Sequence, residues 1–172
     1  YLPEANLYIG QKLLLNDISG PILTKYKSGS KTAAGANERF HYSALSEEEE
    51  RAIASILDYQ QGGNVQHDII QYLNERSENE DKWLLDLKES NIATTLIWGI
   101  EDPVAPTSVA DYVWNTSLKD RDAISNYWQL PTANHYLQNN HPEIMNKIIR
   151  LSLGESIDFN DISVEDMPVK IE

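Results

Sequence analysis

Apolar residues recur at three- and four-residue spacing through the first 90 positions, which is the pattern of amphipathic helices. Nothing in this region alternates apolar and polar residues as a half-buried strand does. Gly20-Pro21 and Gly62-Gly63 are predicted to interrupt the helices of this region. We therefore predict an all-helical block: a helix that follows Asn6 and stops at Gly20, a short turn or helix at 22–26, helices at 46–59, 64–73 and 80–90, and a polar, mobile loop at 27–37.

The clearest helix start lies at Ser46. Its hydroxyl can accept from the amide of Glu49, whose carboxylate can reach back to the amide of Ser46, as in a capping box. Acidic residues at 47–50 also suit the positive end of a helix dipole. This acidic run therefore indicates a helix start far more strongly than a metal site.

The pattern changes at Ile92. Thr94–Gly99 and Ile124–Leu130 are short, rich in β-branched and aromatic residues, and read as buried strands, with a helix opening at Pro106 between them. Pro142–Leu153 reads as a closing helix with Pro at its first position. Strand–helix–strand–helix predicts an α/β protein with a parallel sheet. Two strands make too small a sheet, so the missing strands must come from elsewhere.

Each predicted strand ends in a loop that delivers a chemically useful side chain. The loop after the first strand carries Asp102, and the loop after the second carries His135. This is the back half of a triad in the chain order nucleophile, acid, histidine. The nucleophile is not in this sequence, since no Gly-x-Ser-x-Gly motif occurs. Asp102 has a plainer reading as a turn-forming Asp before Pro103.

Composition narrows the function classes. Twenty-seven acidic residues against fourteen basic ones give a net charge of −13, which argues against nucleic acid or an anionic membrane as a partner. The absence of Cys excludes a disulfide scaffold, a zinc–thiolate site and a Cys nucleophile, but it does not fix the compartment. His41, His67 and His141 are scattered without ligand spacing, so we predict no metal and no cofactor.

The two loops resemble those of α/β-hydrolases: Trp98-Gly-Ile-Glu-Asp102-Pro-Val-Ala-Pro106 is similar to their acid loop, and Leu130-Pro-Thr-Ala-Asn-His135 to their histidine loop. The helical block resembles the lid inserted after their sixth strand. Within the superfamily the chain resembles the branch of haloalkane dehalogenases, epoxide hydrolases and mesoderm-specific-transcript-like hydrolases. This narrower resemblance is carried by Pro3-Glu4, Gln11-Lys-Leu-Leu14, Gly20-Pro-Ile-Leu23, Ser46-Glu-x-Glu-x-x-Ala52, Gly63-Asn64, Ile70-Gln-Tyr-Leu-Asn-Glu-Arg76 and Trp83. Trp114–Ser125 departs from the family in being longer and more polar.

The resemblance implies the C-terminal portion of an α/β-hydrolase fold, incomplete alone, with the N-terminal strands missing. Residues 1–90 would form an all-helical lid, 91–153 the C-terminal part of the core, and 154–172 an acidic tail that we expect to be extended or partly disordered. The implied partner is the N-terminal portion of the same fold, which carries the nucleophile. Because the chain opens at Tyr1 rather than Met, we expect it to be processed, cut or one piece of a longer polypeptide.

The resemblance also implies residue roles. His135 would activate a water or the nucleophile, and Asp102 would support it. Tyr59 and Tyr72 are candidates to donate to an epoxide oxygen, and Trp83 to bind a halide, although tyrosines on amphipathic helices more often only pack. With an Asp nucleophile the small apolar substrate is an epoxide or a haloalkane. The alternatives are a Ser-dependent esterase or lipase, and a non-catalytic hydrolase homologue that binds a ligand.

Overall fold

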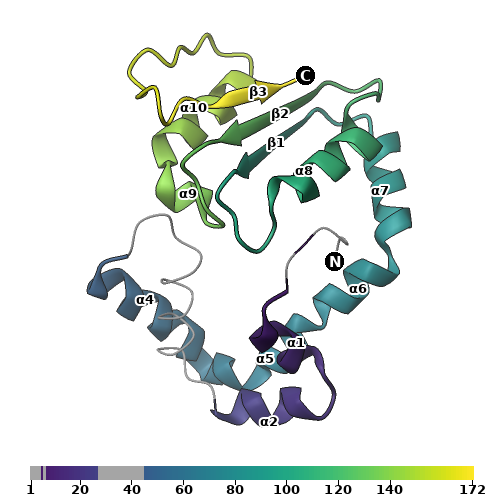
Figure 1. Cartoon of the computed structure of the whole chain (residues 1–172), viewed down its shortest axis with the longest axis vertical. Coiled ribbons are helices and arrows are strands. Elements are labelled where there is room, and N and C mark those ends of the chain that lie inside the picture. The colour runs from purple at the N-terminus through teal and green to yellow at the C-terminus, as the bar shows by residue number, and fades with distance from the viewer. Residues whose placement is uncertain (1–4, 6, 27–44) are drawn as a thin grey trace.

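The computed structural model describes residue 5 and residues 7–26 and 45–172 (Figure 1). The predicted loop at 27–37, His41 and the Pro3-Glu4 pair lie outside these residues. The helical part contains α1 (Ile9–Leu15), α2 (Ser19–Tyr26), α4 (Glu47–Asp58), the 3₁₀ helix η1 (Tyr59–Val65), α5 (Gln66–Ile70), α6 (Tyr72–Glu78) and α7 (Glu80–Glu89). The part with strands contains β1 (Thr94–Gly99), α8 (Thr107–Val113), the π-helix η2 (Trp114–Leu118), β2 (Ser125–Leu130), α9 (Leu137–Asn140), α10 (Pro142–Ser152) and β3 (Val169–Ile171).

The capping box at Ser46 forms as predicted. The Ser46 amide donates to Glu49 Oε2 at 2.9 Å, and the Glu49 amide donates to Ser46 Oγ at 3.3 Å. At the other end of α4, Gln60 and Gln61 adopt left-handed φ values of 49° and 63°, which turn the chain away from the helix axis. The sequence placed this helix end correctly to within a residue.

Two helix predictions were wrong in detail. The helix expected to run to Gly20 is two helices, because the side chain of Asn16 accepts from the amides of Ile18 and Ser19 and starts α2 anew. Gly20 therefore lies inside α2, where a Cβ would come within 2.2 Å of His67 Nδ1. The helix expected over 64–73 is also divided, into α5 and α6, at Gln71.

The sheet has the order β1-β2-β3. β1 and β2 are parallel, in a register that runs from Thr94 opposite Ser125 to Gly99 opposite Leu130. The predicted parallel pair is confirmed. β3 was not predicted: the tail, expected to be extended or partly disordered, returns and pairs antiparallel with β2 (Figure 1).

Alternate residues of β2 point into two separate cores, because successive side chains of a strand face opposite sides. Trp128 and Leu130 pack with Ala133 and with Ile144 and Ile148 of α10. On the other face, Tyr127 packs with residues of α8 and η2: Ala110, Trp114 and Leu118. The strand pair is thus covered by helices on both faces, as in α/β proteins.

Residues of the segment 114–125 contact α7 and the loop that follows it. Ser117 Oγ donates to the carbonyl of Leu84 at 2.9 Å. The Arg121 guanidinium donates to the carbonyls of Leu87 at 2.9 Å and Ile92 at 2.8 Å. The last carbonyls of a helix lack partners within the helix, so Arg121 satisfies groups that α7 leaves open.

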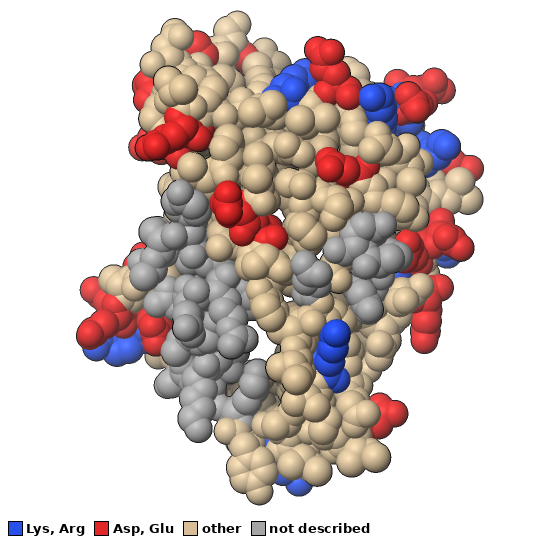
Figure 2. Space-filling view, in the orientation of Figure 1, with Lys and Arg blue, Asp and Glu red and all other residues tan. Residues whose placement is uncertain are grey.

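Acidic side chains are spread over the visible surface of both parts rather than gathered in one patch (Figure 2). Within residues 7–26 and 45–172, no helix combines the length and the apolarity that crossing a membrane requires. Nor does the described part of the chain bring three or more His, Asp or Glu side chains together in a way that could hold a metal ion.

Candidate functional site

The acid loop begins where β1 ends, at Gly99. A Cβ at this position would lie 2.5 Å from the carbonyl oxygen of Ala133 and 2.6 Å from that of Asn134, so the backbone of the histidine loop passes directly over Gly99. Hydrogen bonds continue past the strands, from the Ile100 amide to Leu130 O at 3.0 Å and from the Glu101 amide to Ala133 O at 2.9 Å. A glycine at the strand end therefore allows the two loops to meet.

Asp102 is buried, with 8% of its surface exposed. Its Oδ1 accepts from the amides of Val104 at 2.8 Å and Ala105 at 3.0 Å, which folds the loop around the carboxylate. The indole of Trp98 ties the same loop down by donating to Ala105 O at 2.7 Å. These bonds fix the orientation of the carboxylate and leave Oδ2 directed at His135.

His135 Nδ1 lies 2.9 Å from Asp102 Oδ2. When Nδ1 donates to the carboxylate, the basic lone pair of the neutral imidazole is on Nε2. A third of the His135 side chain, 34%, is exposed, whereas the Asp102 side chain is 6% exposed. The pair therefore combines a sheltered acid with a base that a reactant can approach.

The histidine loop is held on several sides. The Asn134 amide donates to Asn140 Oδ1 of α9 at 3.0 Å, and the His135 amide donates to Asn134 Oδ1 at 2.6 Å. The ring of Tyr136 meets that of His135 edge-on, with centroids 5.2 Å apart. The roles of Asn134, Asn140 and Tyr136 were not predicted from the sequence.

The three predicted substrate-binding residues differ in position. Tyr59 is 71% exposed at the start of η1, and Trp83 is 40% exposed on α7. Tyr72 is 47% exposed on α6. Burial raises the pKa of Tyr136, and the nearby Tyr72 hydroxyl raises that pKa further. Among the three, Tyr72 is the one whose hydroxyl acts electrostatically on a residue of the histidine loop.

The tail also reaches the histidine loop. The hydroxyl of Thr132 donates to Asp166 Oδ1, and His141 Nε2 lies 2.9 Å from Thr132 Oγ1. Hydrogen bonds from Thr132 and then from Ser163 lower the pKa of Asp166, with a smaller contribution from the charge of His141. These residues, apart from His141, carried no signal in the sequence.

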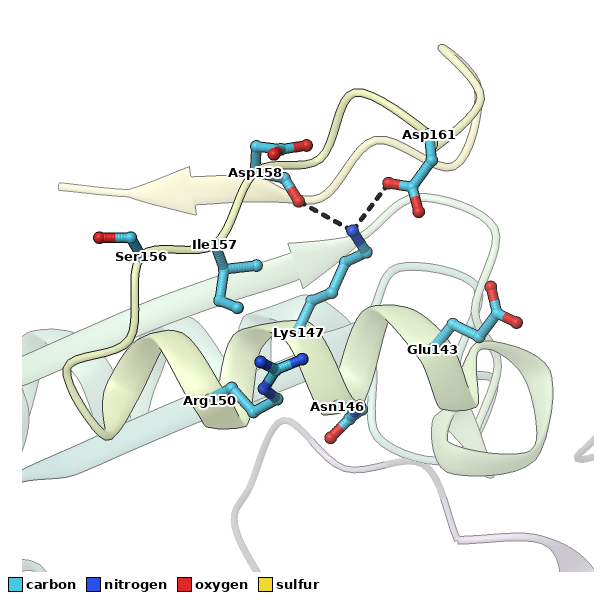
Figure 3. Close-up of a pocket in the computed structure, with 8 residues that line it drawn as sticks. All are labelled: Glu143, Asn146, Lys147, Arg150, Ser156, Ile157, Asp158 and Asp161. Atoms are coloured by element: carbon cyan, nitrogen blue, oxygen red, sulfur yellow. Dashed lines mark hydrogen bonds and ion pairs between the residues drawn. The ribbon is translucent and has the colours of Figure 1, made fainter.

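A surface cavity of about 400 Å³ lies between α10 and the tail (Figure 3), and neither Asp102 nor His135 is among the residues that line it. Lys147 Nζ donates to the carbonyl of Asp158 at 2.9 Å and to Asp161 Oδ1 at 2.7 Å. Arg150 pairs with Glu155 at 2.6 Å. Because Lys147 and Arg150 already have acidic partners in the tail, we interpret this cavity as part of the contact between the tail and α10 rather than as an anion site.

An acid and a histidine thus follow the carboxyl ends of two neighbouring parallel strands, with His135 Nδ1 bonded to Asp102 Oδ2. This is the geometry in which the acid and the histidine of a triad are arranged. No protein-family model matches the chain. It is similar to the protein named "Putative hydrolase LipZ" in two strains of Mycobacterium tuberculosis, CDC 1551 / Oshkosh and ATCC 25618 / H37Rv. Each match is 28% identical over 143 residues, which cover 83% of this chain and 48% of the relative.

The chain thus spans about half the length of the curated relatives it matches. The similarity supports a relationship to a hydrolase at this coarse level. It does not distinguish the haloalkane dehalogenase and epoxide hydrolase branch from other hydrolases.

Proposed function

We propose that this chain supplies the acid, the histidine and the helical lid of a hydrolase with the α/β-hydrolase fold. The observation that carries the proposal is the 2.9 Å contact between His135 Nδ1 and the buried Asp102 carboxylate, at the carboxyl ends of adjacent parallel strands. The similarity to a hydrolase over most of the chain supports it.

In the proposed reaction, Nε2 of His135 takes a proton, and Asp102 stabilises the imidazolium that results. With an Asp nucleophile on the N-terminal portion, attack on a haloalkane breaks the carbon–halogen bond and releases halide. Attack on an epoxide instead breaks a ring C–O bond, whose oxygen takes a proton and stays on the alkyl group. Both attacks form an alkyl-enzyme ester. His135 then removes a proton from the water that attacks the ester carbonyl, and the alcohol leaves as the Asp carboxylate is restored. With a Ser nucleophile, His135 instead takes the serine proton, and the substrate is an ester.

The lid would contribute substrate contacts. Tyr72 is the first candidate, because its hydroxyl raises the pKa of Tyr136, whose ring meets that of His135 edge-on. Tyr59 and Trp83 remain candidates further from the pair. A phenol hydroxyl over the site could donate to the oxygen that an opening epoxide releases.

The proposed partner is the N-terminal portion of the same fold, added at β1. Among the described strands β1 is at the end of the sheet, yet Ile97 packs on the core beneath α10 while Leu96 and Trp98 pack on the core beneath α8. A parallel strand covered on both faces is typical of the interior of a sheet. We propose that the outer edge of β1 pairs with a strand of the N-terminal portion.

The test compares Asp102→Asn and His135→Ala with Glu101→Gln in the complete protein. Glu101 is the neighbouring acid and its side chain is exposed, so it serves as a matched control. We expect both site variants to lower kcat by about 10²–10⁴-fold on an epoxide, a haloalkane or a nitrophenyl ester, whichever is turned over, and Glu101→Gln to keep it.

Intact mass spectrometry of His135→Ala separates the two chemistries. A mass increase equal to the alkyl group indicates an Asp nucleophile whose ester is no longer hydrolysed. Normal turnover by His135→Ala would overturn the proposed function, and ligand binding without turnover by the unaltered protein would favour the non-catalytic homologue.

A further inference from the structure

The C-terminal tail is anchored to the core on both sides of Asp166. Before it, Phe159 and Ile162 pack on the core beneath α10, and the Phe159 ring lies 5.9 Å from that of Trp128. After it, β3 pairs with β2. Asp166 is therefore held in place by contacts that do not involve its own side chain.

The Asp166 carboxylate accepts hydrogen bonds from two hydroxyl groups. Thr132 donates to Oδ1, and Ser163 Oγ donates to Oδ2 at 2.7 Å. Since the Thr132 hydroxyl donates its hydrogen bond to Asp166, its oxygen can accept a hydrogen bond from His141 Nε2 at 2.9 Å. The same nitrogen lies 3.0 Å from the Thr132 carbonyl and 3.9 Å from Asp166 Oδ1. The donors and acceptors of this cluster thus match in one consistent arrangement.

Thr132 belongs to the loop that carries His135. Two residues of this loop are fixed by other contacts: Ala133 O accepts from the Glu101 amide, and the Asn134 amide donates to Asn140. The bond to Asp166 is the one that fixes the loop from the side of the tail. It sits three residues before His135, at the turn where the chain leaves β2.

We infer that Asp166 is a positioning residue for His135, acting through the Thr132 hydroxyl and His141 to hold the histidine loop against the acid loop. This inference rests on the proposed function for the role of His135. Asp166 acts on the site by placing the loop. Without its carboxylate, Thr132 loses its acceptor, His141 loses a nearby negative charge, and the 2.9 Å contact between His135 and Asp102 loses one of its supports.

The experiment compares Asp166→Asn with Asp161→Asn in the complete protein. Asp161 is a second tail acid, but its carboxylate binds Lys147 on α10 and not the histidine loop. Both variants remove one negative charge from the tail. We expect Asp166→Asn to lower kcat about tenfold with KM nearly unchanged, because the loop keeps its other contacts and moves by less than the 1 Å that costs about 10²-fold. Asp161→Asn should keep the kcat of the unaltered protein.

A second measurement follows the His135 ring itself. In ¹⁵N–¹H spectra of the imidazole side chains, Asp166→Asn should shift the Nδ1 resonance of His135, and Asp161→Asn should not. Thr132→Val should reproduce the effect of Asp166→Asn, and Thr132→Ser, which keeps the hydroxyl, should restore the normal resonance. A loss of stability alone would not be rescued in this selective way.

The outcomes separate the two proposals. If His135→Ala abolishes turnover while Asp166→Asn leaves kcat and the His135 resonance unchanged, the positioning role fails and the proposed function stands. If His135→Ala keeps turnover, the proposed function fails, and the spectra still show whether Asp166 orders the ring. Equal effects of Asp161→Asn and Asp166→Asn would overturn the positioning role, because the tail would then act through overall stability.

Discussion

Replacing Gly99 by Ala tests how closely the acid and histidine loops must approach. The added Cβ would lie 2.5 Å from Ala133 O, 2.6 Å from Asn134 O and 2.8 Å from Ala133 C. All three are backbone atoms, so no side-chain rotation can relieve the contact. The histidine loop itself has to move.

The size of the movement follows from these distances. Ordinary carbon–oxygen contacts in proteins begin at about 3.3 Å, so the loop must retreat by about 0.8 Å. A shift of that size stretches the 2.9 Å bond from the Glu101 amide to Ala133 O beyond hydrogen-bonding range. Overpacking costs about 1–3 kcal/mol and the lost bond about 1 kcal/mol, so we expect a loss of about 2–4 kcal/mol of stability.

Activity should fall more steeply than stability suggests. Because His135 follows Asn134 directly, the shift carries the imidazole away from Asp102, and a misplacement near 1 Å costs about 10²-fold in rate. Urea unfolding measures the loss of stability, and kcat in the complete protein measures the loss of activity. If Gly99→Ala matched the unaltered protein in both, the argument from close loop contact would be refuted.

Gly10→Ala provides the matched control. Gly10 lies in α1, and a Cβ there would meet nothing within 4 Å. The same substitution should therefore stabilise the protein by about 0.5–1 kcal/mol, since Ala is favoured over Gly in a helix.

Two further predictions concern buried polar contacts. Tyr127 is fully buried and donates to Asp111, and burial raises its pKa above the usual value near 10. Since the pKa of Tyr127 is higher in the folded state, the stability that the protonated phenol contributes is complete below about pH 10 and is lost as the pH rises further. Urea unfolding at pH 8 and 11 should show that Tyr127→Phe removes this contribution to the pH dependence. At neutral pH the same substitution should cost about 1–2 kcal/mol of stability. Arg121→Lys should cost about 1–3 kcal/mol, because one ammonium cannot span the carbonyls of Leu87 and Ile92, and should speed amide exchange at the end of α7; unchanged exchange would contradict the role of Arg121.

The sequence was most informative where one local pattern decides the structure. The strand Thr94–Gly99, the cap at Ser46 and the helix from Pro142 follow from short-range composition, and the structure has them at those positions. The approach of Asp102 to His135 could be anticipated because parallel neighbouring strands bring their carboxyl ends together.

What the sequence did not reveal depends on contacts between distant segments. Phe159 and Ile162 follow no period, and their packing on Trp128 and α10 decides that the tail is ordered. The division at Asn16 arises from a side chain that competes with the helix for backbone amides. The tyrosines of the helical part posed the same problem, since periodicity puts Tyr59 and Tyr72 on helices without saying which one acts on Tyr136.

The antiparallel β3 makes the two ends of the sheet unequal. β3 is three residues long and carries Lys170, whose ammonium lies 5.8 Å from the centre of the Trp128 ring. Short, lysine-bearing edge strands resist the addition of further strands. We therefore expect further strands to add beyond β1 rather than beyond β3, so the tail closes one end of the sheet and leaves the other end open for pairing.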